Sequence, residues 1–207
     1  MAVEVDLSGV GSGFAAPVFQ SQETYRLILQ AMAFPGRIVT GTYHLERGIG
    51  LDQASAAVCL TLLDGETPLW LQEGCEDRLA SWLRFQCGCP LVEDPAAAAF
   101  ALISDPLAMP PMDTFSSGTA QYPDRSTTLI LQMDTLEEGN LVVIRGPGIK
   151  ERMGLTLASL PEAFWEQRQQ VCDGFPQGID LILTCGRRLA ALPRTTRIER
   201  TLPCTSR

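Results

Sequence analysis

The chain contains one histidine, His44, and one lysine, Lys150. Few side chains can therefore serve as a general base or as the amine of a Schiff base. No serine lies in a Gly-x-Ser-x-Gly pattern, and neither a Walker P-loop nor a Gly-x-Gly-x-x-Gly fingerprint occurs. The sequence thus gives little support to a hydrolase triad, a P-loop nucleotidase or a dinucleotide-binding domain.

Long hydrophobic runs are missing as well. No apolar run approaches the roughly 18 residues of a membrane span. The first 14 residues carry two acids and no basic residue, unlike a signal peptide. We expect residues 1–18 to form a flexible N-terminal arm and residues 19–207 to form one domain, which suits a chain of 207 residues. The expected location is the cytoplasm, without a membrane partner.

The cysteines follow neither a zinc nor a disulfide pattern. Their number is odd, and the closest pair, Cys87 and Cys89, lacks the two-residue spacing of a zinc knuckle. We expect reduced, mostly buried thiols and no metal site. The seven cysteines are Cys59, Cys75, Cys87, Cys89, Cys172, Cys185 and Cys204.

Charge is distributed unevenly along the chain. The formal net charge of −8 disfavours binding to nucleic acid. From Arg187 to the end, six arginines stand against one acid, Glu199, which gives +5 in this segment and −13 before it. A basic segment on an acidic body suits an anionic ligand or an acidic partner surface. The alternative is a solvated edge, or arginines paired with the protein's own acids.

A buried hairpin is the expected centre of the fold. Ile179–Cys185 is an apolar run between turn formers, which predicts a strand buried on both faces. Leu189–Leu192 predicts a second strand that ends at Pro193 or lies at a sheet edge. Asp52–Leu63 is ambiguous, because it can be a strand paired with Leu69–Leu71, but its alanine content favours a helix.

Helical and strand patterns alternate along the rest of the chain. Helices are predicted at Phe19–Phe34, Asp52–Leu63, Cys75–Phe85 and from a capping box at Ser159 to about Cys172. Strands are predicted at Arg37–Thr40, Leu69–Leu71, Phe100–Ile103, Thr127–Met133 and Leu141–Arg145. Ser21 is the expected N-cap of the first helix and Asp52 that of the second. The expected apolar faces comprise Tyr25, Ile28, Leu29 and Met32 on the first helix and Leu79, Trp82 and Leu83 on the third. Interleaved elements predict a single α/β domain with a mixed sheet flanked by helices.

Two segments with arginines are candidate anion sites. In Arg145–Lys150, with the sequence RGPGIK, exposed backbone N–H groups could cradle a phosphate or phosphonate beside the two cationic side chains. The alternative is a tight type II turn that needs glycine. In Arg194–Arg197, two guanidiniums and two hydroxyls could bind an oxyanion, unless the segment is a strand end in solvent. The candidate ligand-binding residues are Arg145, Gly146, Gly148, Lys150, Arg194 and Arg197.

A series of short motifs runs in order from about residue 19 to residue 200 and covers nearly the whole chain. The motifs include Tyr25-Arg26, Phe34-Pro35-Gly36, Thr67–Leu71, Leu83–Phe85, Thr128–Gln132, Gly146–Ile149, Gly178–Cys185 and Pro193–Thr196. Together they are specific, and they resemble the PhnH family of bacterial carbon–phosphorus lyase subunits.

This resemblance implies a role in organophosphonate catabolism. In that family, PhnH joins PhnG, PhnI and PhnJ in a core complex that couples methylphosphonate to the ribose of ATP. Adenine is released and ribose 1-methylphosphonate 5-triphosphate is formed. The resemblance also implies a fold similar to the large domain of PLP-dependent transferases but without PLP, and a homodimer when the subunit is isolated. It carries over no catalytic residue.

Two functions are therefore open. The first is a structural and substrate-positioning subunit of a multi-subunit transferase, with no cofactor of its own. The alternative is a stand-alone enzyme or binding protein for a small phosphonate or phosphate ester. Lys150 is the one residue that could hold PLP as a Schiff base, and it directly follows the Gly-Pro-Gly-Ile turn.

Overall fold

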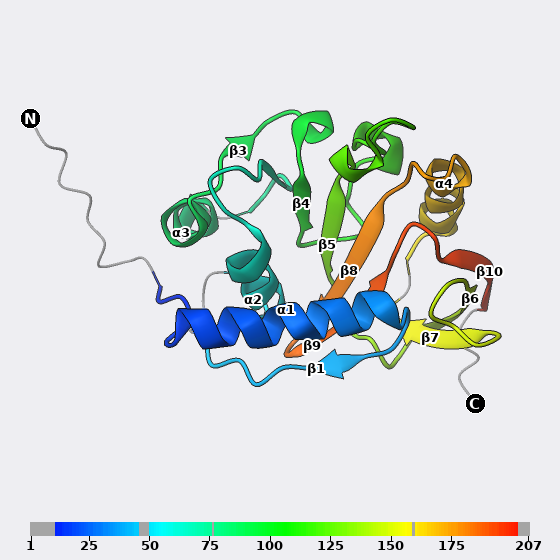
Figure 1. The fold of residues 1–207 in the computed structure, drawn as a ribbon, viewed down its shortest axis with the longest axis horizontal. Coiled ribbons are helices and arrows are strands. Elements are labelled where there is room, and N and C mark those ends of the chain that lie inside the picture. The colour runs from blue at the N-terminus through cyan, green and yellow to red at the C-terminus, as the bar shows by residue number, and fades with distance from the viewer. Residues whose placement is uncertain (1–10, 46–49, 76, 159, 203–207) are drawn as a thin grey trace, which may run out of the picture.

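The computed structural model describes residues 11–45, 50–75, 77–158 and 160–202. Within this part of the chain, a seven-stranded mixed sheet and a three-stranded antiparallel sheet combine with four α-helices (Figure 1). The large sheet holds β1 (Val39–Thr40), β2 (Leu69–Leu71), β3 (Leu91–Val92), β4 (Phe100–Ile103), β5 (Thr128–Gln132), β8 (Asp180–Cys185) and β9 (Arg188–Leu192). The small sheet holds β6 (Asn140–Arg145), β7 (Met153–Leu157) and β10 (Arg197–Leu202). The helices are α1 (Pro17–Ala33), α2 (Gln53–Leu62), α3 (Asp77–Cys87) and α4 (Glu162–Asp173).

The strand order of the large sheet is β1-β9-β8-β5-β4-β2-β3. Strands β8, β5, β4, β2 and β3 run parallel, whereas β9 and β1 pair antiparallel at one end. This arrangement confirms the predicted α/β class and the mixed sheet. The predicted hairpin is also confirmed as β8 and β9, with β9 ending directly before Pro193.

Both faces of the large sheet are covered. Helices α1, α2 and α3 pack on one face, and α4 with the small sheet packs on the other (Figure 1). Alternate residues of β8 reach the two layers: Ile182 joins the first cluster and Leu183 the second. A parallel strand buried on both faces needs a nearly continuous apolar sequence, which explains the run that marks β8.

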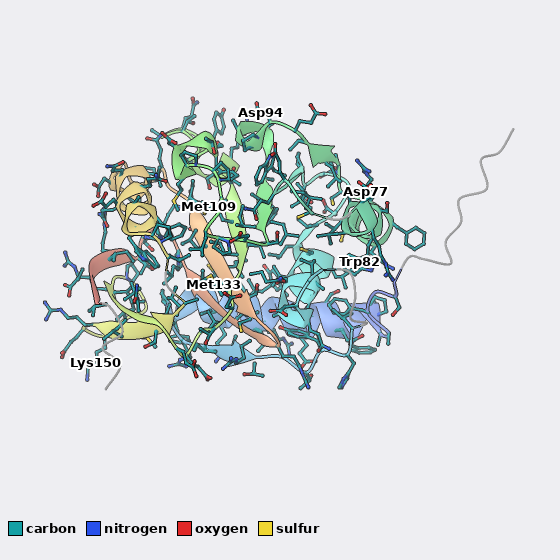
Figure 2. All side chains as sticks on the ribbon, turned by 180° about the vertical axis from the view of Figure 1, so that it is seen from behind. Asp77, Trp82, Asp94, Met109, Met133 and Lys150 are labelled. Atoms are coloured by element: carbon teal, nitrogen blue, oxygen red, sulfur yellow. The ribbon has the colours of Figure 1, made fainter. Side chains whose placement is uncertain are left out.

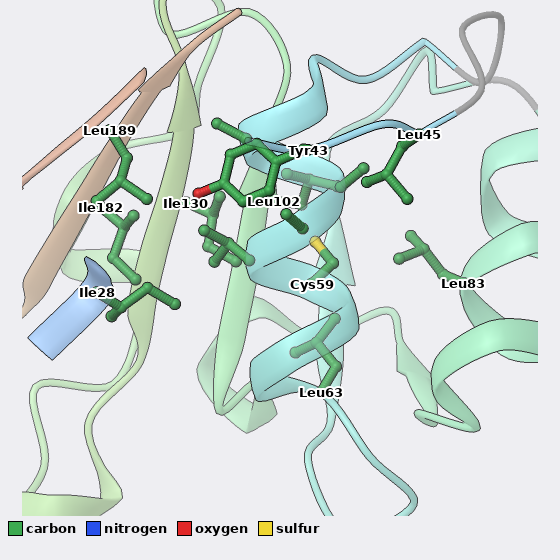
Figure 3. Packing of buried hydrophobic residues seen from close by; sticks show 14 of the residues in the cluster. Ile28, Tyr43, Leu45, Cys59, Leu63, Leu83, Leu102, Ile130, Ile182 and Leu189 are labelled. Carbon is green, nitrogen blue, oxygen red and sulfur yellow. The ribbon is translucent and has the colours of Figure 1, made fainter. Parts of the chain in front are cut away.

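The long dimension of the molecule separates two regions. Asp77, at the start of α3, and Lys150, in the hairpin loop between β6 and β7, lie at opposite ends (Figure 2). Near the α3 end, Cys59 of α2 and Leu83 of α3 lie in the first cluster beside Ile130 of the sheet (Figure 3). Tyr43 is 3% exposed there, and its burial, with a smaller effect of Glu23, raises the pKa of its phenol to about 12.

Two details of the predicted first helix are wrong. The helix begins at Pro17 rather than near Ser21, because proline fits the first turn and the Gln20 side chain accepts a hydrogen bond from Ala16 N at 2.8 Å. The buried face is also rotated. Thr24, Ile28 and Ala31 are buried, whereas Tyr25 and Leu29 of the predicted face are each 49% exposed.

The other predicted helices differ less from the structure. The ambiguous segment is the helix α2, which excludes the strand alternative, but the Asp52 carboxylate caps no N–H of that helix. Helix α3 starts two residues later than predicted, with Leu79, Trp82 and Leu83 buried as expected. The residue that precedes α4 is Pro161, so the capping-box prediction is wrong; its Ser159 lies outside the described residues.

Three strands were not predicted. They are β3, β7 and β10, and the last two flank β6 in the small sheet. In β7 and β10 apolar residues do not form a run, so no local pattern marks them. The expected strand end after Arg194 is therefore the start of a paired strand.

The N-terminal arm is partly described. Residues 1–10 lie outside the described residues. The carbonyl oxygen of Gly11 accepts hydrogen bonds from Trp82 Nε1 and Gln86 Nε2, both at 3.0 Å, and Phe14 is 9% exposed. Residues 11–14 therefore pack against α3.

The prediction that the cysteines are mostly buried is confirmed for the six that the structure describes. All six are free thiols, and four of them are buried; Cys204 lies outside the described residues. No helix in the described ranges is long and apolar enough to cross a membrane.

Candidate anion-binding site

The predicted loop between β6 and β7 begins with a type II turn. Ile149 N donates to Gly146 O at 3.1 Å, Pro147 occupies the second position, and Gly148 has φ +81°. A Cβ at Gly148 would lie 2.1 Å from Ala33 O at the end of α1. The turn and its contact with α1 therefore both require glycine at position 148. This agrees with the alternative interpretation of the loop, a tight type II turn that needs glycine.

This turn closes a hairpin that brings two arginines together. Ile144 of β6 is the register partner of Met153 of β7, so Arg145 and Arg152 occupy the next pair of positions toward the turn. On the other side of β6, Arg145 is the register partner of Arg197 in β10. The three side chains therefore form one row across adjacent strands, which are spaced about 4.8 Å apart. We call Arg197, Arg145 and Arg152 the arginine row.

A groove of about 840 Å³ lies beside the arginine row. Its lining residues are Val143, Arg145, Arg152, Gln169, Asp173, Arg197, Ile198 and Glu199. The walls therefore come from β6, β10 and the C-terminal half of α4, three elements that are distant in the sequence.

A β-bulge supplies the first carboxylate of the groove. The register of β10 against β6 shifts between Ile198 and Arg200, so Glu199 is the extra residue. Its side chain contacts Arg145 Nε at 3.3 Å through one oxygen and Arg152 Nε at 2.5 Å through the other. One carboxylate therefore serves two arginines.

Helix α4 supplies the second carboxylate. Asp173 Oδ1 accepts hydrogen bonds from Arg197 Nη1 at 2.5 Å and from Gln169 Nε2 at 2.7 Å. Asp173 is 61% exposed and Arg197 34% exposed, so this pair is reached by water. With three guanidiniums and two carboxylates, the groove has a net charge of +1 on a chain of net charge −8.

Arg194 does not face this groove. Its guanidinium donates to the Asp180 carboxylate, to Ser126 Oγ at 2.6 Å and to the carbonyl oxygens of Pro123 and Pro176. All three nitrogens are used, and the side chains of Arg194 and Asp180 are 17% and 19% exposed. We therefore leave Arg194 out of the site. Lys150 is exposed in the hairpin loop and is not part of the groove lining.

Sequence reasoning missed Arg168, which holds the segment before the arginine row. This α4 residue is fully buried and donates to the carbonyl oxygens of Thr196 at 2.8 Å, Pro193 at 2.8 Å and Leu192 at 3.2 Å. The turn from β9 into β10 is thereby fastened to α4. The available signal was its helical spacing from Phe164 and Trp165, which places Arg168 on the apolar face.

Arg152 was also missed. It sits between the glycine turn and an unrecognised strand, so nothing local marks it as a partner of Arg145. A register count outward from the Gly-Pro-Gly turn would have placed the two arginines opposite each other, had β7 been predicted.

A second cavity, of about 710 Å³, opens at the carboxyl ends of β5 and β8, where ligands often bind in α/β folds. Three of its lining residues, Asp52, Gln132 and Arg188, have paired side chains, whereas the exposed Arg187 side chain forms no ion pair with a described residue. Asp52 accepts a hydrogen bond from Gly186 N at 2.7 Å and donates from its own N to Gln132 Oε1 at 2.7 Å. Arg188 pairs with Glu137 at 2.5 Å. An anion would therefore find fewer guanidinium groups with unpaired terminal nitrogens in this cavity than in the groove beside the arginine row.

Fold and groove together define an α/β domain with a basic surface site. Among the described residues, no three histidine, cysteine, aspartate or glutamate side chains are placed to hold a metal ion. A family model described as "Bacterial phosphonate metabolism protein (PhnH)" matches residues 12–199. The chain belongs to this family.

Two curated relatives are similar over most of the chain. One is the "Alpha-D-ribose 1-methylphosphonate 5-triphosphate synthase subunit PhnH" of Rhizobium meliloti (strain 1021), 38% identical over 191 residues, which is 90% of this chain and 94% of the relative. The other is the "Putative C-P lyase subunit protein HtxG" of Stutzerimonas stutzeri, 29% identical over 182 residues, or 87% and 86% of the two chains. Both relatives are named as subunits.

Proposed function

We propose that the chain is a subunit of a carbon–phosphorus lyase core complex that supports the synthesis of ribose 1-methylphosphonate 5-triphosphate from ATP and methylphosphonate. The observation that carries this proposal is the match to a subunit of that synthase over 90% of the chain. Its role is structural and substrate-positioning, because the groove offers guanidiniums but no nucleophile beside a base. Chemistry is assigned to other subunits in the cytoplasm.

The proposed partners are PhnG-, PhnI- and PhnJ-type subunits, with a second copy of the chain taking their place when the protein is isolated. An apolar surface on α1 and its ends supports a protein partner. Large apolar side chains are normally rare in one exposed cluster of a monomer. The exposed residues are Val18 at 79%, Phe19 at 75%, Tyr25 at 49%, Leu29 at 49% and Phe34 at 44%.

Co-expression with the other core subunits tests the proposal. We expect the tagged chain to co-purify in one stoichiometric complex by affinity capture and sizing. Leu29→Arg should abolish capture and turn the isolated chain into a monomer, because a charge on an apolar interface remains unpaired when it is buried. Leu107→Arg, at a residue that is 66% exposed in a loop away from α1, is the matched control. If wild type stays free of the other subunits, the proposal is wrong.

A second candidate function is a stand-alone enzyme or binding protein for a small phosphonate or phosphate ester. The arginine row favours it, because guanidiniums bind such anions through charge-assisted hydrogen bonds. Turnover of a phosphonate by the purified chain, without other subunits, would support this candidate. Activity seen only in the assembled complex would favour the subunit role.

We also propose that the domain shares the architecture of the PLP-transferase large domain and works without PLP. Lys150 is exposed in the hairpin loop of the small sheet (Figure 2), whereas the second cavity lies at the carboxyl ends of β5 and β8. The lysine that could form a Schiff base and the cavity that could hold the cofactor therefore belong to different sheets. An absorbance band of an internal aldimine in the purified protein, lost in Lys150→Ala, would contradict this proposal.

A further inference from the structure

We propose that the arginine row binds a chain of phosphates, such as the triphosphate end of a ribose 5-triphosphate. The choice of a ribose 5-triphosphate as the ligand rests on the proposed function. The preference for a chain of phosphates rests on the geometry of the arginine row alone. Arg152 is assigned here as a ligand-binding residue, together with Arg145 and Arg197. Glu199 and Asp173 are assigned as the carboxylates that occupy the row while the groove is empty.

The first support is the number of guanidinium nitrogens that remain available. Among the described residues, Arg145 and Arg152 each contact Glu199 through Nε, and their terminal nitrogens donate no hydrogen bond. Arg197 uses one terminal nitrogen on Asp173. The side chain of Arg145 is 61% exposed and that of Arg152 71% exposed, and both residues line the groove, so these donors are accessible to a ligand.

The second support is the placement of like charges in one row. Arg145 and Arg197 are direct register partners, an arrangement that destabilises an antiparallel pair. Glu199 and Asp173 offset two of the three positive charges of the row, so one positive charge remains uncompensated when the groove holds no ligand. A bound anion would reduce the repulsion between these arginines. The free energy of folding that the like charges cost is therefore recovered in part when an anion binds.

The third support is the extent of the row. Arg197 and Arg145 lie on the neighbouring strands β10 and β6, and Arg152 directly precedes β7, so the row spans about two strand spacings, or about 10 Å. A single phosphate can contact one or two of them, whereas a chain of three phosphates reaches all three. The groove volume of about 840 Å³ leaves room for a sugar beyond the phosphates.

Calorimetry on the full chain tests the inference, with inorganic triphosphate, diphosphate and phosphate as probes in buffer without divalent cations. We expect triphosphate to bind about tenfold more tightly than phosphate. Each of Arg145→Ala, Arg152→Ala and Arg197→Ala should weaken triphosphate binding about tenfold, which is what losing one hydrogen bond between charged groups costs. The control is Arg78→Ala, an exposed arginine on α3 at the other end of the molecule, which should bind as wild type does.

The carboxylates give a sharper test, because their removal should improve binding. Glu199→Gln and Asp173→Asn remove a competing negative charge, and we expect each to tighten triphosphate binding about threefold. A purely structural role of Glu199 would instead weaken binding when it is substituted, since Arg145 and Arg152 would lose their common partner.

Three outcomes would overturn the inference: no triphosphate binding, binding that the three alanine variants do not change, or equal affinity for phosphate and triphosphate. If the alanine variants lose only co-purification and wild type does not bind triphosphate, the row faces an acidic partner surface and the inference is wrong. Triphosphate binding by a chain that fails to join the complex would leave the inference standing while the proposed function fails.

Discussion

Two groups of arginines in this protein have opposite surroundings. Arg168 lies in the core and Arg194 is partly buried, and their guanidiniums donate mainly to backbone carbonyls and to one carboxylate. Arg145 and Arg152 lie in the groove, more than half exposed, with terminal nitrogens that donate to no described residue. The comparison shows that burial and pairing of the terminal guanidinium nitrogens, not residue type, separate a structural arginine from one available to a ligand.

The two groups are also connected. Arg168 fixes the carbonyls of Leu192, Pro193 and Thr196, and the next residue in the chain is Arg197 of the arginine row. Helix α4 thus carries both the buried clamp, Arg168, and a wall of the groove, Asp173. Stability at the clamp and binding in the groove can be separated by experiment, because the exposed arginines contribute little to folding.

The largest effect is expected for Arg168→Met. This variant removes three hydrogen bonds. It leaves the carbonyls of Leu192 and Thr196 without their Arg168 donor, whereas Pro193 O keeps its hydrogen bond from Thr196 N at 2.8 Å. Each unsatisfied group costs about 1–3 kcal/mol. We expect the free energy of unfolding to fall by about 3–5 kcal/mol in urea denaturation. Arg78→Met, at an exposed site on α3, is the matched control and should stay within about 0.5 kcal/mol. A loss below about 1 kcal/mol for Arg168→Met would mean that the clamp does not hold the turn.

A smaller effect is expected for the buried ion pair of Arg194 and Asp180. The two side chains are 17% and 19% exposed and 2.6 Å apart, so either single substitution leaves a partly buried charge unpaired. Arg194→Gln and Asp180→Asn should each lower the free energy of unfolding by about 2–4 kcal/mol.

Double-mutant cycles compare the partly buried ion pair with an ion pair of the groove. We expect a coupling of about 2 kcal/mol for Arg194 with Asp180, against less than about 0.5 kcal/mol for the more exposed pair of Arg197 with Asp173. Equal couplings in the two cycles would remove the distinction between the core and groove arginines.

Gly148→Ala should cost less than the Arg168 and Arg194 substitutions, because it disturbs only the contact of the hairpin turn with the end of α1. The new Cβ would meet Ala33 O at 2.1 Å, and φ at this position is +81°. Gly74 is a matched control with φ +88° and open space around its Cβ position. Gly74→Ala should cost about 1 kcal/mol from backbone strain alone, and Gly148→Ala about 2–3 kcal/mol by thermal or urea unfolding. Similar losses would show that the contact with α1 is not needed.

Several elements of the fold were predictable because their burial leaves a local pattern in the sequence, although the pattern of α1 predicted the wrong face. The run Ile179–Cys185 marks β8 because that strand is buried on both faces, and Leu79, Trp82 and Leu83 mark the buried face of α3. The Gly-Pro-Gly turn was predictable because proline and glycine fix its backbone angles. In each case the residues themselves carry the physical constraint.

The candidate site was less predictable, because strand pairing assembles it. Arg145 and Arg197 are neighbours through the register of β6 with β10, although 51 residues lie between them in the sequence. Arg194 and Arg197 look alike in the sequence, yet the turn after Pro193 sends one into the core and the other into the groove. No local pattern distinguishes these two arginines.

The smallest effect on stability is expected in the arginine row itself. Arg145→Gln removes the ion pair with Glu199, in which the Arg145 side chain is 61% exposed, so the loss is at most about 0.5–1 kcal/mol. The same substitution removes the like charge opposite Arg197, which should stabilise the strand pair. These contributions oppose each other, so the free energy of unfolding should change by less than about 0.5 kcal/mol in urea. A loss above about 2 kcal/mol would mean that Arg145 is structural, as Arg194 is. An unchanged or slightly raised stability would show that this position is not optimised for folding, which is expected of a residue kept for a ligand that is present only part of the time.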